Sequence, residues 1–271
     1  METESQLPSF VQPPLDEVAL DLQFSSLPIK AAELGAFRSL IADEYPYSLD
    51  VPPLLPSFET EGSPPIPPFA LNVGGGLLPR SWFISADDEH VVQLQADRLI
   101  INWRLRPNGG IYPRYPEVRQ RFVTAHEALT VFVHRHGYPD IMPNQCELGY
   151  FNKILLPAGA GWGDVHALLK GFSINSMQPE VEGFSDCHLL LRRLIQNQSG
   201  HGFRRLQVEC RPIQIGIDQK AWALNLTVKG RPSQPDLGSA LSFFDTAHAE
   251  IVRCFANITT ENMHRLWEKQ V

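Results

Sequence analysis

The sequence EVALDLQF, residues 17–24, alternates apolar and polar side chains. Its valine, two leucines and phenylalanine fall on one side of an extended chain, and both acids and the glutamine fall on the other. A period of two is typical of a β-strand with one face against a core. Such a strand belongs to a sheet whose apolar face must be covered by another layer.

Three strand-like stretches follow at close spacing, over residues 80–85, 90–95 and 98–106. Short polar turns separate them, and Pro-Asn-Gly-Gly ends the third, which predicts an antiparallel meander. The apolar residues of 116–136 then recur at helical spacing, and Gly and Pro follow. This pattern predicts a long helix that covers the meander.

The second half of the chain repeats this order loosely. We expect a strand over 146–156, an irregular stretch over 157–183, three strands at 187–195, 203–215 and 221–229, and a long helix over 237–258. The predicted fold is therefore α+β, with two pseudo-repeated halves, each an antiparallel meander sheet packed against one long helix.

The predicted organisation is a flexible tail (1–14), an N-terminal half (15–141) and a C-terminal half (142–271). Eight prolines lie between residues 46 and 68, and this density predicts an extended connection without regular elements.

Composition narrows the class of protein. The 271 residues are 43% hydrophobic with a net charge of -7. No run of apolar residues is long enough for a membrane helix, and the N-terminus is acidic where a signal peptide is basic. Four cysteines without paired spacing predict free thiols. We expect a cytoplasmic protein with no membrane attachment, cofactor or metal.

Residues 98–121, here called the arginine block, contain six arginines and one acid, Glu117. The block carries +5, so the rest of the chain carries -12. Arginine grips carboxylate or phosphate with two parallel hydrogen bonds. The block is thus the main candidate for binding an anionic partner, with six candidate residues: Asn102, Arg104, Arg106, Tyr112, Arg114 and Tyr115. Alternatively, these arginines form a solvated sheet face and pair with acids of the same chain, such as Asp87, Asp88, Glu89 and Glu117.

No catalytic motif stands out. The glycines of residues 159–164 depart from GxGxxG spacing, the nine histidines form no HExxH, and no cysteine has a protease signature. His248 lies on the apolar stripe of the last long helix and is expected in the core. Glu147, Tyr150 and Asn152 form a polar set on one strand, in which Glu147 is an acid–base candidate or the partner of an arginine.

Several short motifs together resemble a sporadically distributed prokaryotic family of uncharacterised proteins. They are the Pro-Pro-Leu-Asp-Glu-Val strand at 13–18, Leu-Gln-x-x-Arg at 94–98, Asn-Trp-Arg at 102–104, Tyr-Pro-x-Tyr at 112–115, Glu-x-x-Tyr-x-Asn at 147–152, and Phe-x-x-Ile-Thr at 255–259 with Trp267. The resemblance implies a prokaryotic, cytoplasmic protein and no particular activity. A patchy occurrence is typical of accessory genes such as defence or toxin–antitoxin components.

Two functions of different classes remain open. The leading hypothesis is a non-catalytic adaptor that holds a partner protein through the arginine-bearing sheet face or the Pro-rich segment. The alternative is a small-molecule or nucleotide-binding protein, or an enzyme, with a pocket between sheet and long helix. Nucleic acid is disfavoured because the rest of the chain is acidic, although the arginine block leaves it possible.

Overall fold

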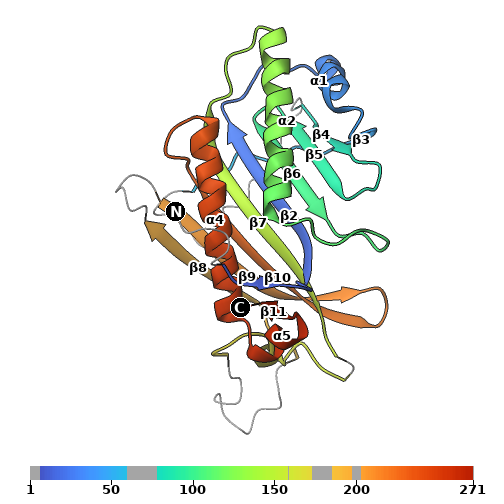
Figure 1. Ribbon diagram of the computed structural model, residues 1–271, viewed down its shortest axis with the longest axis vertical. Coiled ribbons are helices and arrows are strands. Elements are labelled where there is room, and N and C mark those ends of the chain that lie inside the picture. Colours follow the sequence, from blue (N-terminus) through green and yellow to red (C-terminus); the bar gives the residue numbers. More distant parts are fainter. Residues whose placement is uncertain (1–6, 60–77, 158, 173–184, 197–202, 271) are drawn as a thin grey trace.

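The structure is a computed structural model that describes residues 7–59, 78–157, 159–172, 185–196 and 203–270. Within these ranges the chain is α+β, with a nine-stranded sheet whose neighbouring strands all pair antiparallel (Figure 1). In sheet order the strands are β3 (Tyr47–Val51), β4 (Arg80–Ile84), β5 (His90–Gln95), β6 (Arg98–Arg104), β2 (Leu15–Phe24), β7 (Pro143–Leu155), β10 (Gln219–Gly230), β9 (Phe203–Ile215) and β8 (Leu189–Gln196).

In the described part of the chain, five α-helices accompany the sheet. They are α1 (Leu34–Ile41), α2 (Tyr115–Arg135), α3 (Val165–Leu168), α4 (Leu237–Ile258) and α5 (Glu261–Leu266). The long helices α2 and α4 lie on the same face of the sheet, with α2 over β6 and β2 and α4 over β7 and β10 (Figure 1). The core sits in this layer between sheet and helices.

The alternation in residues 17–24 explains which face the helices cover. Val18, Leu20 and Leu22 of β2 are fully buried on the helix side. Phe122 and Leu129 of α2 are also fully buried, as part of the same core. Burial of such side chains is the main source of stability for a layer of this kind.

The opposite face of the sheet is polar and is crossed by residues 54–59. Ser57 donates its backbone N–H to Gln23 Oε1 at 2.9 Å, and Arg98 donates to the carbonyl of Leu55 at 3.2 Å. Glu59 accepts from Arg205 at 2.7 Å, on the far side of the sheet centre. This segment therefore adds hydrogen-bond partners to polar side chains of this face, several of which also bond to one another.

The described part of the Pro-rich segment, residues 46–59, contains one regular element, contrary to the expectation of none. β3 lies in a gap between prolines: Pro46 precedes it, Pro52 and Pro53 follow it, and each residue within it keeps a backbone N–H. Its five residues pair with β4 in continuous register at the edge of the sheet. Residues 60–68 of the segment lie outside the described residues.

The tail expected to be loose is partly ordered. Ser9–Phe10 (β1) pairs with Lys269–Gln270 (β11), and Phe10 is buried against Phe255 and Trp267. Aromatic burial explains this order, which the polar composition of the tail did not indicate. Residues 1–6 lie outside the described ranges.

The two expected halves meet within one sheet. β2 pairs with β6 on one side and with β7 on the other, so hydrogen bonding continues across the expected boundary at residues 141 and 142. All four cysteines are free. No helix in the described part of the chain is long and apolar enough to cross a membrane.

Candidate functional site

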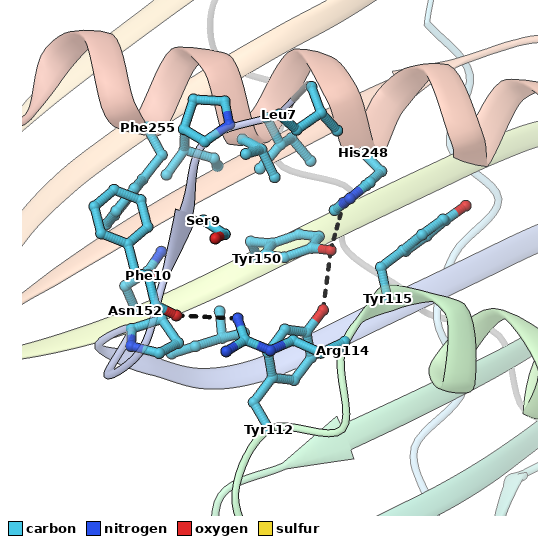
Figure 2. Close-up of a pocket in the computed structure, with 16 residues that line it drawn as sticks. Leu7, Ser9, Phe10, Tyr112, Arg114, Tyr115, Tyr150, Asn152, His248 and Phe255 are labelled. Carbon is cyan, nitrogen blue, oxygen red and sulfur yellow. Dashed lines mark hydrogen bonds between the residues drawn. The ribbon is translucent and has the colours of Figure 1, made fainter. Parts of the chain in front are cut away.

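A pocket of about 140 Å³ lies between the sheet, α4 and the chain segment that leads into α2 (Figure 2). Apolar side chains form most of its wall, and the principal ones are Phe10, Leu15, Leu226, Ile251 and Phe255. Its polar lining residues include Tyr112, Arg114, Tyr150, Asn152 and His248. We call this cavity the α4 pocket.

Three polar side chains of the α4 pocket form a hydrogen-bonded chain. The hydroxyls of Tyr112 and Tyr150 are 3.2 Å apart, and the Tyr150 hydroxyl lies 2.8 Å from His248 Nδ1 (Figure 2). Burial lowers the pKa of His248 to about 4. The imidazole is therefore neutral at neutral pH, and in the tautomer with hydrogen on Nε2 its Nδ1 accepts from Tyr150.

α2 and α4 fix the position of His248 together. The Tyr115 ring stacks on the imidazole, with centroids 4.1 Å apart and planes 5° apart. The Tyr115 hydroxyl donates to Asp245 Oδ1 at 2.8 Å, and Arg119 binds both oxygens of that carboxylate at 2.7 and 3.1 Å. Burial, together with Asp245, raises the pKa of Tyr115, so its hydroxyl remains protonated and a donor.

Arg114 stands at the mouth of the α4 pocket, immediately before α2. Its backbone has φ +75° and ψ 158°, a region that residues with a side chain rarely adopt. Its Nη1 donates to the backbone carbonyl of Phe10 at 3.0 Å, and its guanidinium lies over the Tyr112 ring, 5.9 Å from the centroid (Figure 2). Backbone strain of this kind persists only where surrounding contacts hold it.

The N-terminal segment closes the outer side of the α4 pocket. The rings of Phe10 and Phe255 meet edge to face at 5.4 Å. Val11 donates its backbone N–H to the Glu268 carbonyl at 3.1 Å, next to the β1–β11 pair. The wall of the pocket thus depends on residues from both ends of the described chain.

A second cavity, of about 360 Å³, lies on the polar face of the sheet. Asn102 and Arg104 line it, together with Glu17, Trp82 and Gln93. Asn102 donates to Glu17 and accepts from Gln93. Burial raises the pKa of Glu17, although the hydrogen bond from Asn102 opposes this shift. We call this cavity the polar groove.

The structure places the six candidate residues predicted from sequence on two different faces of the sheet. Tyr112, Arg114 and Tyr115 line the α4 pocket, whereas Asn102 and Arg104 line the polar groove on the other face. Arg106 lies near the polar groove, and it binds Asp88 as Arg104 does.

Most of the arginine block is paired within the chain. Arg98 binds Asp21, Arg104 and Arg106 bind Asp88, Arg119 binds Asp245, and Arg121 binds Glu44 and Glu117. Among the described residues, Arg114 is the one arginine of the block with no carboxylate within ion-pair distance. The block is largely a set of internal ion pairs, as its alternative interpretation expected.

Sequence reasoning missed the apolar half of the pocket. Phe10, Ile251 and Phe255 gave no functional signal, because helical spacing and aromatic residues also mark an ordinary core. Tyr150 and His248 were noticed separately, but they lie 98 positions apart and nothing in the sequence joins them. Glu147 pairs with Lys229 at 3.0 Å rather than with an arginine of the block.

Two of the four cysteines are buried in the core. Burial raises the pKa of Cys210 to about 12 and that of Cys146 further, so both thiols stay protonated and are weak nucleophiles. No group of three His, Cys, Asp or Glu side chains placed to hold a metal ion occurs in the described ranges.

No protein-family model matches this chain, and no curated protein matches its sequence.

Proposed function

We propose that this protein binds a small, largely apolar molecule in the α4 pocket without transforming it. The observation that carries the proposal is the pocket itself, whose walls are mostly aliphatic and aromatic. The polar lining includes Arg114, Asn152 and the hydrogen-bonded chain of Tyr112, Tyr150 and His248. Ligand sites in proteins have this composition, with an apolar lining and a few polar groups that fix orientation.

The volume sets the size of the ligand. A cavity of about 150 Å³ lined by Leu, Ile and Phe accommodates benzene in another protein. The α4 pocket, at about 140 Å³, suits a ligand with one aromatic ring or a short branched chain. A nucleotide is much larger, so this pocket favours a small ligand among the alternatives left open by the sequence.

A variant whose pocket is filled by a larger side chain tests whether ligands bind there. Ile251→Trp places an indole in the pocket, and Ile217→Trp makes the same change at an 87% exposed turn residue as a matched control. Toluene and phenol are titrated into each protein and followed by ¹H–¹⁵N NMR. We expect saturable shifts around the pocket in the wild type and in Ile217→Trp, and none in Ile251→Trp. Saturable shifts that persist in Ile251→Trp contradict the proposal.

A protein-binding role is the second candidate, and strand β3 favours it. β3 is an edge strand within the Pro-rich segment, and Tyr47 and Leu49 are 59% and 46% exposed. An exposed sheet edge offers backbone groups to an extended segment of another protein. Leu49→Lys would weaken such pairing, and affinity purification from the native host should then lose a partner that the wild type retains at stoichiometric amounts.

We also propose a cytoplasmic location and a role in a prokaryotic accessory system. Four free thiols suit a reducing cytoplasm. The motifs that resemble the sporadically distributed prokaryotic family support an origin in an accessory system, such as a defence or toxin–antitoxin system. Expression of the neighbouring genes with and without this one, followed by a phage-survival assay, tests that origin.

We also propose that the two halves are a structural pseudo-repeat, each with a meander and a covering helix. The sheet order supports this proposal: outward from the centre, one side runs β2, β6, β5, β4 and the other runs β7, β10, β9, β8. Each side is followed in sequence by a long helix, α2 or α4, on the same face. Superposition of residues 15–135 on 143–258 in an experimental structure tests it.

A further inference from the structure

We infer that the ligand of the α4 pocket is a monocarboxylate with a compact apolar body, and that Arg114 binds its carboxylate at the pocket mouth. This inference rests on the proposed function. It adds the chemical class of the ligand and the residue that recognises it.

The first argument is charge. Five of the six arginines in the arginine block have carboxylate partners inside the chain, with Arg104 and Arg106 sharing Asp88. Arg114 donates instead to a neutral backbone carbonyl, that of Phe10. Its positive charge lies beside an apolar cavity in a protein of net charge -7. A carboxylate is the group that the guanidinium fork fits best at such a place.

The second argument is position. Arg114 precedes the first turn of α2, whose N-terminus carries a partial positive charge. Its φ of +75° places the residue in a strained conformation, and its side chain lies across the Tyr112 ring at the pocket (Figure 2). The strain is held by the hydrogen bond to Phe10 and by the start of α2. A ligand carboxylate would bind a cation that is already oriented.

The third argument limits the ligand to one charge. Beyond the mouth the wall is formed mainly by Leu15, Leu226, Ile251 and Phe255, with polar groups from Tyr150 and Asn152, and His248 is neutral. A second ionised group in the interior would have no partner of opposite charge, and burying it would be costly. A dicarboxylate with its second carboxylate in the interior is therefore disfavoured, whereas an aryl or short branched-chain monocarboxylate places its apolar part against these side chains.

A series of three ring compounds tests the inference. Benzoate, benzamide and toluene have similar shapes, but they carry a carboxylate, a neutral polar group and no polar group, respectively. Their affinities for the wild type are measured by NMR titration. A charge-assisted hydrogen bond at an exposed mouth predicts that benzoate binds about tenfold tighter than benzamide.

Matched variants assign the preference to one residue. Arg114→Gln should bind benzoate and benzamide equally well, and Arg114→Lys should retain part of the preference. Arg121→Gln removes a paired arginine of α2 and should keep the full preference. In the wild type, benzoate affinity should fall with rising salt while toluene affinity does not, which tests the charge even if Arg114→Gln fails to fold.

The outcomes separate the two proposals. If toluene binds and benzoate binds no tighter than benzamide, the carboxylate inference is overturned while the pocket proposal stands. If the preference persists in Arg114→Gln, the assignment to Arg114 is wrong. If none of the three compounds binds the wild type, the proposed function fails and the inference fails with it.

Discussion

Asp21→Asn would remove a carboxylate from the polar face at the centre of the sheet. Asp21 forms an ion pair with Arg98 at 2.9 Å, and the two side chains are only 14% and 6% exposed. Burial raises the pKa of Asp21 to about 7, with Arg98 opposing the shift and the carboxylate of Glu147, its neighbour across the β2–β7 ladder, adding to it. The folded protein therefore holds this proton more tightly than the unfolded chain does.

The magnitude follows from the two pKa values. The unfolded group titrates near 3.8 and the folded group near 7, a difference of about 3 units. Each unit corresponds to about 1.4 kcal/mol. Between pH 4 and pH 7 the native state binds more protons than the unfolded state, so the free energy of unfolding falls as pH rises. Asp21 should lower it by about 4 kcal/mol across this window, with little change above it.

Urea denaturation from pH 4 to pH 8 provides the assay. The wild type should lose stability relative to Asp21→Asn as pH rises, and the slope of the difference is the readout, because loss of the Arg98 partner adds an offset. Asp218→Asn, a change of the same kind at an exposed turn, should run parallel to the wild type. The reasoning would be refuted if the difference in unfolding free energy between the wild type and Asp21→Asn stayed constant with pH. It would also be refuted if the wild type became more stable relative to Asp21→Asn as pH rises.

Three further perturbations test the core, a helix cap and the pocket chain. Leu129→Ala empties a fully buried position under α2 and should cost about 2–5 kcal/mol of unfolding free energy in urea; a loss below 1 kcal/mol would contradict its packing. Asp236→Ala removes the side chain that accepts from Ser239 N at 2.7 Å at the start of α4, and should cost about 1 kcal/mol in the same assay. His248 should titrate near pH 4 by ¹⁵N NMR. Tyr150→Phe deletes a hydroxyl that donates to the neutral imidazole, so it should raise the pKa of His248. An unchanged pKa would show that Tyr150 does not donate to His248.

The α+β class could be predicted because each main element carries its own periodicity. The alternation of 17–24 identified β2, and helical spacing identified α2 and α4 to within a residue of their observed bounds. The order of strands across the sheet was not accessible, because it depends on which strands pair their backbone edges, and this is set by the tertiary structure. Nothing in residues 17–24 or 146–156 states that β2 and β7 pair.

The site was harder to predict than the fold. Asn102, Arg104 and Arg106 were predicted as site residues because they belong to the positively charged arginine block. A strand places alternate side chains on one face, and Asn102 and Arg104 lie on the face opposite the α4 pocket, with Arg106 near them. Tyr112 and Arg114 were identified for their chemistry, yet their apolar surroundings come from β2, β10 and α4. A pocket assembled from distant elements leaves no local pattern in the sequence.

The central position of β2 has a consequence for how the chain folds. Gln23 of β2 and Asn144, at the start of β7, are hydrogen-bonded across 121 positions of sequence. On the ribosome, β2 must therefore wait for most of the first 155 residues before both of its edges are paired. Contacts of such separation slow folding and leave apolar strands exposed for longer. We expect the nascent N-terminal half to require chaperones, and refolding to depend on protein concentration through aggregation.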